Sequence, residues 1–117
     1  DGTLRECVDT VRNITNAIAG GNEYALLKAL TAADTERSVL RYTLSMLERV
    51  IRDAAVMRCG VSSISCCPDE AKKLGAKLSP RKLEAVHEIL RDTINDLDTN
   101  VAPGIELASL CGQIFNI

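Results

Sequence analysis

The sequence is poor in aromatic residues, with no tryptophan, one phenylalanine and two tyrosines among 117 residues. Its interior must therefore be built from leucine, isoleucine, valine, alanine and methionine, which suits packed helices better than a β-sandwich. Apolar residues still make up 46% of the chain and charged residues 26%, so the chain can bury a core and is not compositionally disordered. Its length predicts one domain.

The chain also lacks an excess of positive charge and a long apolar run. The formal net charge is −2, which argues against a dedicated nucleic-acid domain, because such domains usually carry a basic excess. No segment approaches the roughly 20 apolar residues that a membrane-spanning helix needs. No signal-peptide pattern opens the chain. The first residue is aspartate rather than methionine, which predicts a fragment or a processed chain.

Sequence motifs for phosphate binding and for cysteine chemistry are missing too. The chain contains no GxxxxGK[ST], no GxGxxG and no CxxC. Among the five cysteines, Cys66 and Cys67 are adjacent, a spacing typical of neither a zinc knuckle nor a redox pair. The odd number leaves one thiol outside any set of disulfides, and we expect reduced thiols. We expect no cofactor and no metal.

His87 is the single histidine, and its sequence context can be interpreted in two ways. With Glu84 it forms one Glu-x-x-His motif, but a diiron site in a helical bundle needs two. A general acid would need a partner that the local spacing does not supply. We therefore interpret His87 as a partly exposed structural histidine. The acids that recur at every fourth position of the same segment are interpreted as a solvated face: Glu84, Glu88, Asp92 and Asp96.

The periodicity predicts an all-α fold, a single compact bundle of about five to six helices. Apolar residues recur at intervals of three and four, and no segment of useful length alternates as a strand would. Asn22 and Ser79 are expected N-caps, and Gly20 with Gly21 is an expected helix stop. The predicted helices cover residues 3–19, 23–32, 36–58, 68–77, 80–97 and 105–115.

The individual segments allow finer predictions. Residues 36–58 carry two apolar stripes, which predicts a central helix with more than one neighbour. Asp34 or Thr35 is the expected cap of this helix, and residues 100–104 are expected to form a turn. The segment 105–115 is apolar nearly all round, which predicts that it is sandwiched between neighbours or lies at a subunit interface.

Three segments, taken in order, carry a resemblance to a known family. They are residues 22–27 (NEYALL) leading into 35–40 (TERSVL), residues 47–60 (LERVIRDAAVMRCG) and residues 97–107 (LDTNVAPGIEL). Together they resemble the C-terminal domain of the delta-prime subunit of the bacterial DNA polymerase III clamp loader. The second segment is similar to the family's long helix, and the third to its Asn-rich turn and final apolar helix. One departure is the acid of the last helix, which is Glu106 rather than a residue near Ala108.

The resemblance implies a fold and a role. In such loaders a small helical C-terminal domain follows an N-terminal ATPase-type module, and five of the helical domains form a closed ring called the collar. Residues 1–117 would then be one non-catalytic oligomerisation domain without a cofactor or a small-molecule substrate. The implied parent belongs to the DNA polymerase III holoenzyme, a DNA-directed DNA polymerase of the bacterial cytoplasm. The implied partners are the tau/gamma and delta subunits, with DNA reached only through the whole complex and no membrane.

An interface between helical domains buries apolar side chains at its centre and places ions at its rim. For apolar candidates the alternative is packing inside the domain, and for charged candidates it is a solvated ion pair. The alternative function is a stand-alone helical module that docks a partner through its apolar last helix, and a small helical enzyme is a third. The interface candidates are Leu107, Leu110, Ile114 and Phe115 for the centre, and Arg52 and Asp53 for the rim.

Overall fold

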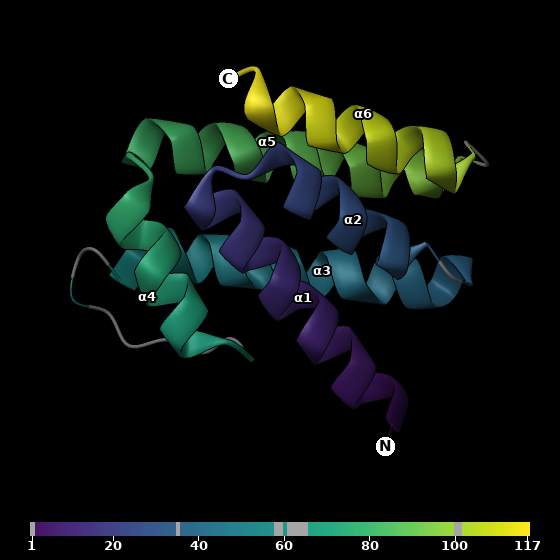
Figure 1. Cartoon of the computed structure of the whole chain (residues 1–117), viewed down its shortest axis with the longest axis horizontal. Coiled ribbons are helices and arrows are strands. Elements are labelled where there is room, and N and C mark those ends of the chain that lie inside the picture. Colours follow the sequence, from purple (N-terminus) through teal and green to yellow (C-terminus); the bar gives the residue numbers. More distant parts are fainter. Residues whose placement is uncertain (1, 35, 58–59, 61–65, 100–101) are drawn as a thin grey trace.

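The computed structural model describes residues 2–34, 36–57, 60, 66–99 and 102–117. Within these ranges the chain forms six helices and no strand, which confirms the predicted all-α bundle (Figure 1). None of the described helices is long and apolar enough to cross a membrane. The helices are α1 (Gly2–Gly20), α2 (Glu23–Ala33), α3 (Arg37–Met57), α4 (Pro68–Lys77), α5 (Pro80–Leu97) and α6 (Pro103–Phe115).

Local sequence signals determine where several helices begin and end. The Asn22 side chain accepts a hydrogen bond from the Ala25 N–H at 3.0 Å, and Ser79 Oγ accepts one from the Lys82 N–H at 3.2 Å. Each satisfies a backbone donor that has no partner within the helix. Helix α1 ends because Gly21 adopts a φ of 67°, a left-handed conformation that glycine takes without steric cost. Both predicted caps and the predicted stop are confirmed.

Two boundary predictions need correction. Helix α6 begins at Pro103, so the turn predicted for residues 100–104 is wrong at its last two positions. Proline suits a first helical turn because its φ is already helical and its missing N–H has no helical partner there. Residues 100–101 lie outside the described part of the chain, as does Thr35, one of the two expected caps. Asp34 instead ends α2, where its N–H donates to the Thr31 carbonyl at 3.1 Å.

The buried face of α2 includes Leu30 but leaves out Tyr24 and Leu27, although a spacing of three would place all three together. Leu26, Leu30 and Ala33 are buried, whereas Tyr24 is 74% exposed. Because α2 is apolar on most of its circumference, spacings of three and of four both yield an apolar stripe. Packing against α1 and α6 buries the stripe of Leu26, Leu30 and Ala33, whose spacings are four and three, and leaves Tyr24 on the surface.

The helices enclose the core in a closed series of contacts. Helix α1 packs on α2, α2 on α6, α6 on α5, α5 on α3, and α3 on α1, while α4 covers α1 and α3 (Figure 1). The predicted central helix is confirmed, because α3 contacts α1, α4 and α5. An apolar stripe of α3 and one of α5 face inward. The buried residues they contribute are Leu40, Leu44, Leu47, Ile51, Ala54, Leu83, Val86, Leu90, Ile94 and Leu97.

Helices α3 and α4 approach each other closely at Gly75. A Cβ placed on Gly75 would lie 2.6 Å from the carbonyl oxygen of Ala54. Both residues are buried, so the two backbones touch without an intervening side chain. The absence of a side chain at Gly75 therefore determines how near α4 sits to the central helix.

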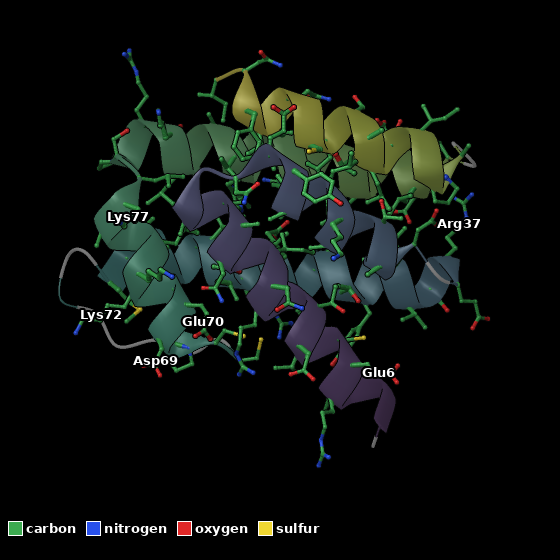
Figure 2. The ribbon with its side chains drawn as sticks, in the orientation of Figure 1. Glu6, Arg37, Asp69, Glu70, Lys72 and Lys77 are labelled. Carbon is green, nitrogen blue, oxygen red and sulfur yellow. The ribbon has the colours of Figure 1, made fainter. Side chains whose placement is uncertain are left out.

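Polar contacts join helices at opposite ends of the bundle. At one end Arg41 Nε donates to Asp98 Oδ1 at 2.8 Å, and Arg37 donates to the Leu97 carbonyl, linking α3 to the end of α5. At the other end Arg12 Nε donates to Glu70 Oε1 at 3.1 Å, linking α1 to the first turn of α4. Figure 2 shows Arg37 and Glu70 far apart on the ribbon. Helix α4 is thus linked to α1 by the Arg12–Glu70 ion pair as well as by packing.

Candidate functional site

The surface between α3 and α5 contains a hollow of about 310 Å³, which we call the α3–α5 groove. Its floor is apolar, because Ile51 and Leu83 line it and are each only 1% exposed. Val56 stands at its edge and is 41% exposed. The residues that line the groove are Ile51, Arg52, Ala55, Val56, Pro80, Leu83, Glu84 and His87.

Local structure explains why the space is left open. The Ser79 cap and Pro80 at the first helical position begin α5 beside the last turns of α3. Opposite them α3 presents Ala55, whose methyl group is too short to fill the gap between the two helices. The two walls carry opposite charges, with exposed Arg52 on α3 and exposed Glu84 on α5. An apolar floor between opposite charges can accept an apolar side chain and orient its charged neighbours.

His87 lines the same groove and is half-buried, as predicted for a structural histidine. Its Nε2 lies 4.0 Å from Glu48 Oε1 across the α3–α5 contact, and both side chains are about a quarter exposed. Nε2 is buried and has no hydrogen-bond partner within the described part of the chain. The spacing of four between Glu48 and Arg52 favours a pair along α3, but the contact found for Glu48 is the one to His87. Protonation of His87 would turn this contact into an ion pair between the two helices.

The candidates predicted for an apolar interface centre lie mostly inside the domain. Leu107, Leu110 and Ile114 are 3%, 0% and 9% exposed, and Phe115 is half-buried against the core. Helix α6 lies between α2 and α5, so the first of its two predicted settings, between neighbouring helices, applies to its apolar stripe. In the isolated domain these three side chains therefore have little surface to offer a partner. The large apolar side chain that α6 exposes is Ile105.

The two candidates for a charged rim separate in the structure. Arg52 is exposed and lines the α3–α5 groove, whereas Asp53 is 4% exposed and belongs to the buried set. Successive residues of a helix point about 100° apart, so one can face solvent while the next faces the core. Arg52 therefore remains available at a surface, and Asp53 does not.

The other charged residues singled out in the sequence lie on the surfaces of α3 and α5. Glu84, Glu88, Asp92 and Asp96 are exposed on α5, in agreement with a solvated face. No group of three or more histidine, cysteine or acidic residues suited to a metal occurs in the described ranges. Two arginines of α3 are engaged at the end of α5, as described above for Arg37 and Arg41.

A larger hollow, of about 570 Å³, lies between α1 and α2. Alanines, asparagines and one glycine line most of it, and Lys28 is its one charged lining residue. It therefore lacks a pair of opposite charges. The sequence patterns do not predict the α3–α5 groove. Its one signal is the run of small side chains at Ala54 and Ala55 beside the aliphatic Val56.

The fold and the groove define an all-helical domain with an apolar surface recess between charged walls. The chain matches no protein-family model, and no curated protein and no solved structure matches it.

Proposed function

We propose that this domain is a protein-assembly domain that receives a neighbouring helical domain in the α3–α5 groove, in the manner of a clamp-loader collar. The observation that carries the proposal is the apolar floor of Ile51 and Leu83 between Arg52 and Glu84. Interfaces combine an apolar centre with a charged rim, and this groove presents both within one recess.

The sequence resemblance supports the finer part of the proposal. The α3 wall of the groove lies within residues 47–60, one of the three segments that resemble the collar domain of the clamp-loader delta-prime subunit. The all-α bundle is the fold that such a domain requires. We accordingly propose tau/gamma and delta subunits as the partners, with DNA reached only through the whole complex.

The alternative, a stand-alone module that docks through its last helix, has less support. The apolar stripe of α6 packs on α2 and α5, so it would have to leave the core before it could bind. A stand-alone module that uses the α3–α5 groove remains the second candidate, and the identity of the partner separates the two.

Complex formation tests the proposal. The domain is mixed with tau/gamma and delta subunits encoded by the same genome, and the mass of the complex is measured by light scattering after gel filtration. We expect a stoichiometric complex containing the domain. Elution of the domain alone, beside assembled partners, would contradict the clamp-loader proposal.

A matched pair of variants locates the contact. Val56→Asp places a carboxylate at the groove edge, and burying it without a partner should weaken the complex at least about tenfold. Leu4→Asp is the control, because Leu4 is an aliphatic residue of similar exposure, 45% against 41%, on α1. If both variants weaken binding equally, or neither does, the groove is not the contact surface.

A further inference from the structure

Cys66 and Cys67 precede α4, and the structure places their Sγ atoms 3.3 Å apart. Cys66 is exposed, whereas Cys67 is fully buried. Cys67 is also the N-cap residue of α4, and its carbonyl accepts the first helical hydrogen bond from the Ala71 N–H at 2.9 Å. The Cys66 thiol is thus open to solvent, and the buried Cys67 thiol is in contact with it.

The surroundings of the two thiols favour a sequential reaction. Burial first, then the hydrogen bond and charge of Cys66 and the charge of Glu70, raise the pKa of the Cys67 thiol to about 12, while the Arg12 guanidinium opposes the rise. Cys66 is therefore the thiol that an external reagent meets first. Once Cys66 is a neutral disulfide it no longer raises the pKa of Cys67. The second thiol then becomes easier to deprotonate, with Arg12 beside it to stabilise the thiolate.

We propose that Cys66 and Cys67 form a redox-responsive dithiol that small-molecule disulfides, such as oxidised glutathione, convert to a vicinal disulfide. The adjacent spacing alone suggested no redox pair, and the short distance between the sulfurs is what revises that expectation. This inference concerns the N-terminal end of α4 and does not depend on the α3–α5 groove.

The reaction balances in two thiol–disulfide exchanges. Cys66 loses its proton to solvent and attacks one sulfur of the oxidant, so a Cys66–S–S–R bond forms, the oxidant's disulfide breaks, and the leaving thiolate takes up a proton. Cys67 then loses its proton and attacks Cys66 Sγ, which forms the intramolecular disulfide and releases a second R–SH. The two thiols lose two electrons and two protons, and one disulfide of the oxidant is reduced to two thiols.

The product should be easily reversed. Adjacent Cα atoms are about 3.8 Å apart across a trans peptide, which is shorter than the usual separation in disulfides of about 4.4–6.8 Å. A disulfide between neighbours is therefore strained, and strained disulfides are the readily reduced, regulatory ones. An excess of reduced glutathione should restore the dithiol.

Peptide mapping of the oxidised chain tests the inference. The reduced protein is incubated with oxidised glutathione, digested and analysed by mass spectrometry. We expect the peptide containing residues 66–67 to lose the mass of two hydrogens, and to regain it with reduced glutathione. Glutathione that persists on Cys66 of the wild-type chain, or a disulfide from Cys66 to a different cysteine, would overturn the inference.

Two variants serve as controls for the order of events. Cys67→Ser should trap glutathione on Cys66, because no neighbouring thiol can displace it. Cys66→Ser should leave Cys67 unmodified over the same time, because Cys67 is fully buried. Modification of Cys67 in the second variant at the wild-type rate would contradict the proposed role of Cys66 as the entry point.

Discussion

Gly75 offers a sharp test of how α4 sits on the central helix. In Gly75→Ala the new Cβ would lie 2.6 Å from the Ala54 carbonyl oxygen, 3.4 Å from its carbon and 3.6 Å from its Cα. These are backbone atoms of α3, so no side-chain rotation can relieve the contact. Helix α4 must move away by several tenths of an ångström, and the surrounding core must follow.

The magnitude follows from two opposing effects. Overpacking a well-packed site costs about 1–3 kcal/mol, and a rigid backbone neighbour favours the upper part of that range. Alanine gains up to about 1 kcal/mol over glycine in a helix, which offsets part of the loss. We expect the free energy of unfolding to fall by about 1–2 kcal/mol, although alanine is the better helix former.

Gly112→Ala is the matched control for this experiment. Gly112 lies in α6, and a Cβ added there meets nothing within 4 Å. This variant should raise the free energy of unfolding by about 0.5–1 kcal/mol. Urea unfolding followed by far-ultraviolet circular dichroism measures both. Equal stabilisation by the two substitutions would refute the close contact between α3 and α4.

Three further predictions address other parts of the structure. Leu110→Ala should lower the free energy of unfolding by about 2–5 kcal/mol in urea titrations, because Leu110 is fully buried, whereas Ile105→Ala should change it by less than about 0.5 kcal/mol. Ser79→Ala should cost about 1 kcal/mol in the same assay through loss of the α5 cap. The hydrogen bond from Arg41 lowers the pKa of Asp98, so its stabilising contribution is present above the ordinary carboxyl pKa of about 4 and is lost as the pH falls through the lowered value. The difference in urea midpoint between wild type and Asp98→Asn should therefore shrink on acidification below about pH 4, and a constant difference would contradict the pairing.

Much of the fold could be predicted from local patterns. The helices at residues 68–77 and 80–97 begin and end where their prolines, the Ser79 cap and the apolar spacing indicate. Such signals act within a few residues, so they can be recognised without tertiary structure. The start of α6 lies outside the predicted helix, because proline and glycine are typical of turns, yet Pro103 and Gly104 begin its first helical turn.

The candidate site depended on tertiary structure and was less predictable. The apolar pattern of residues 105–115 allowed either burial or an interface, and only the packing of α2 and α5 around Leu110 distinguishes them. The α3–α5 groove joins residues more than twenty positions apart, such as Val56 and Pro80. The groove is the space that the side chains of α3 and α5 leave unfilled, whereas apolar periodicity predicts only which residues of each helix are buried.

The central claim is that the α3–α5 groove receives a partner domain. A titration of the isotope-labelled domain with unlabelled tau/gamma and delta subunits, followed by two-dimensional nuclear magnetic resonance, tests it most directly. We predict shifts or line broadening concentrated at the groove residues Arg52, Ala55, Val56 and Glu84, with Leu4 and other α1 surface positions far less affected. Perturbations confined to other helices, or none at partner concentrations that saturate binding of the wild-type chain, would contradict the claim.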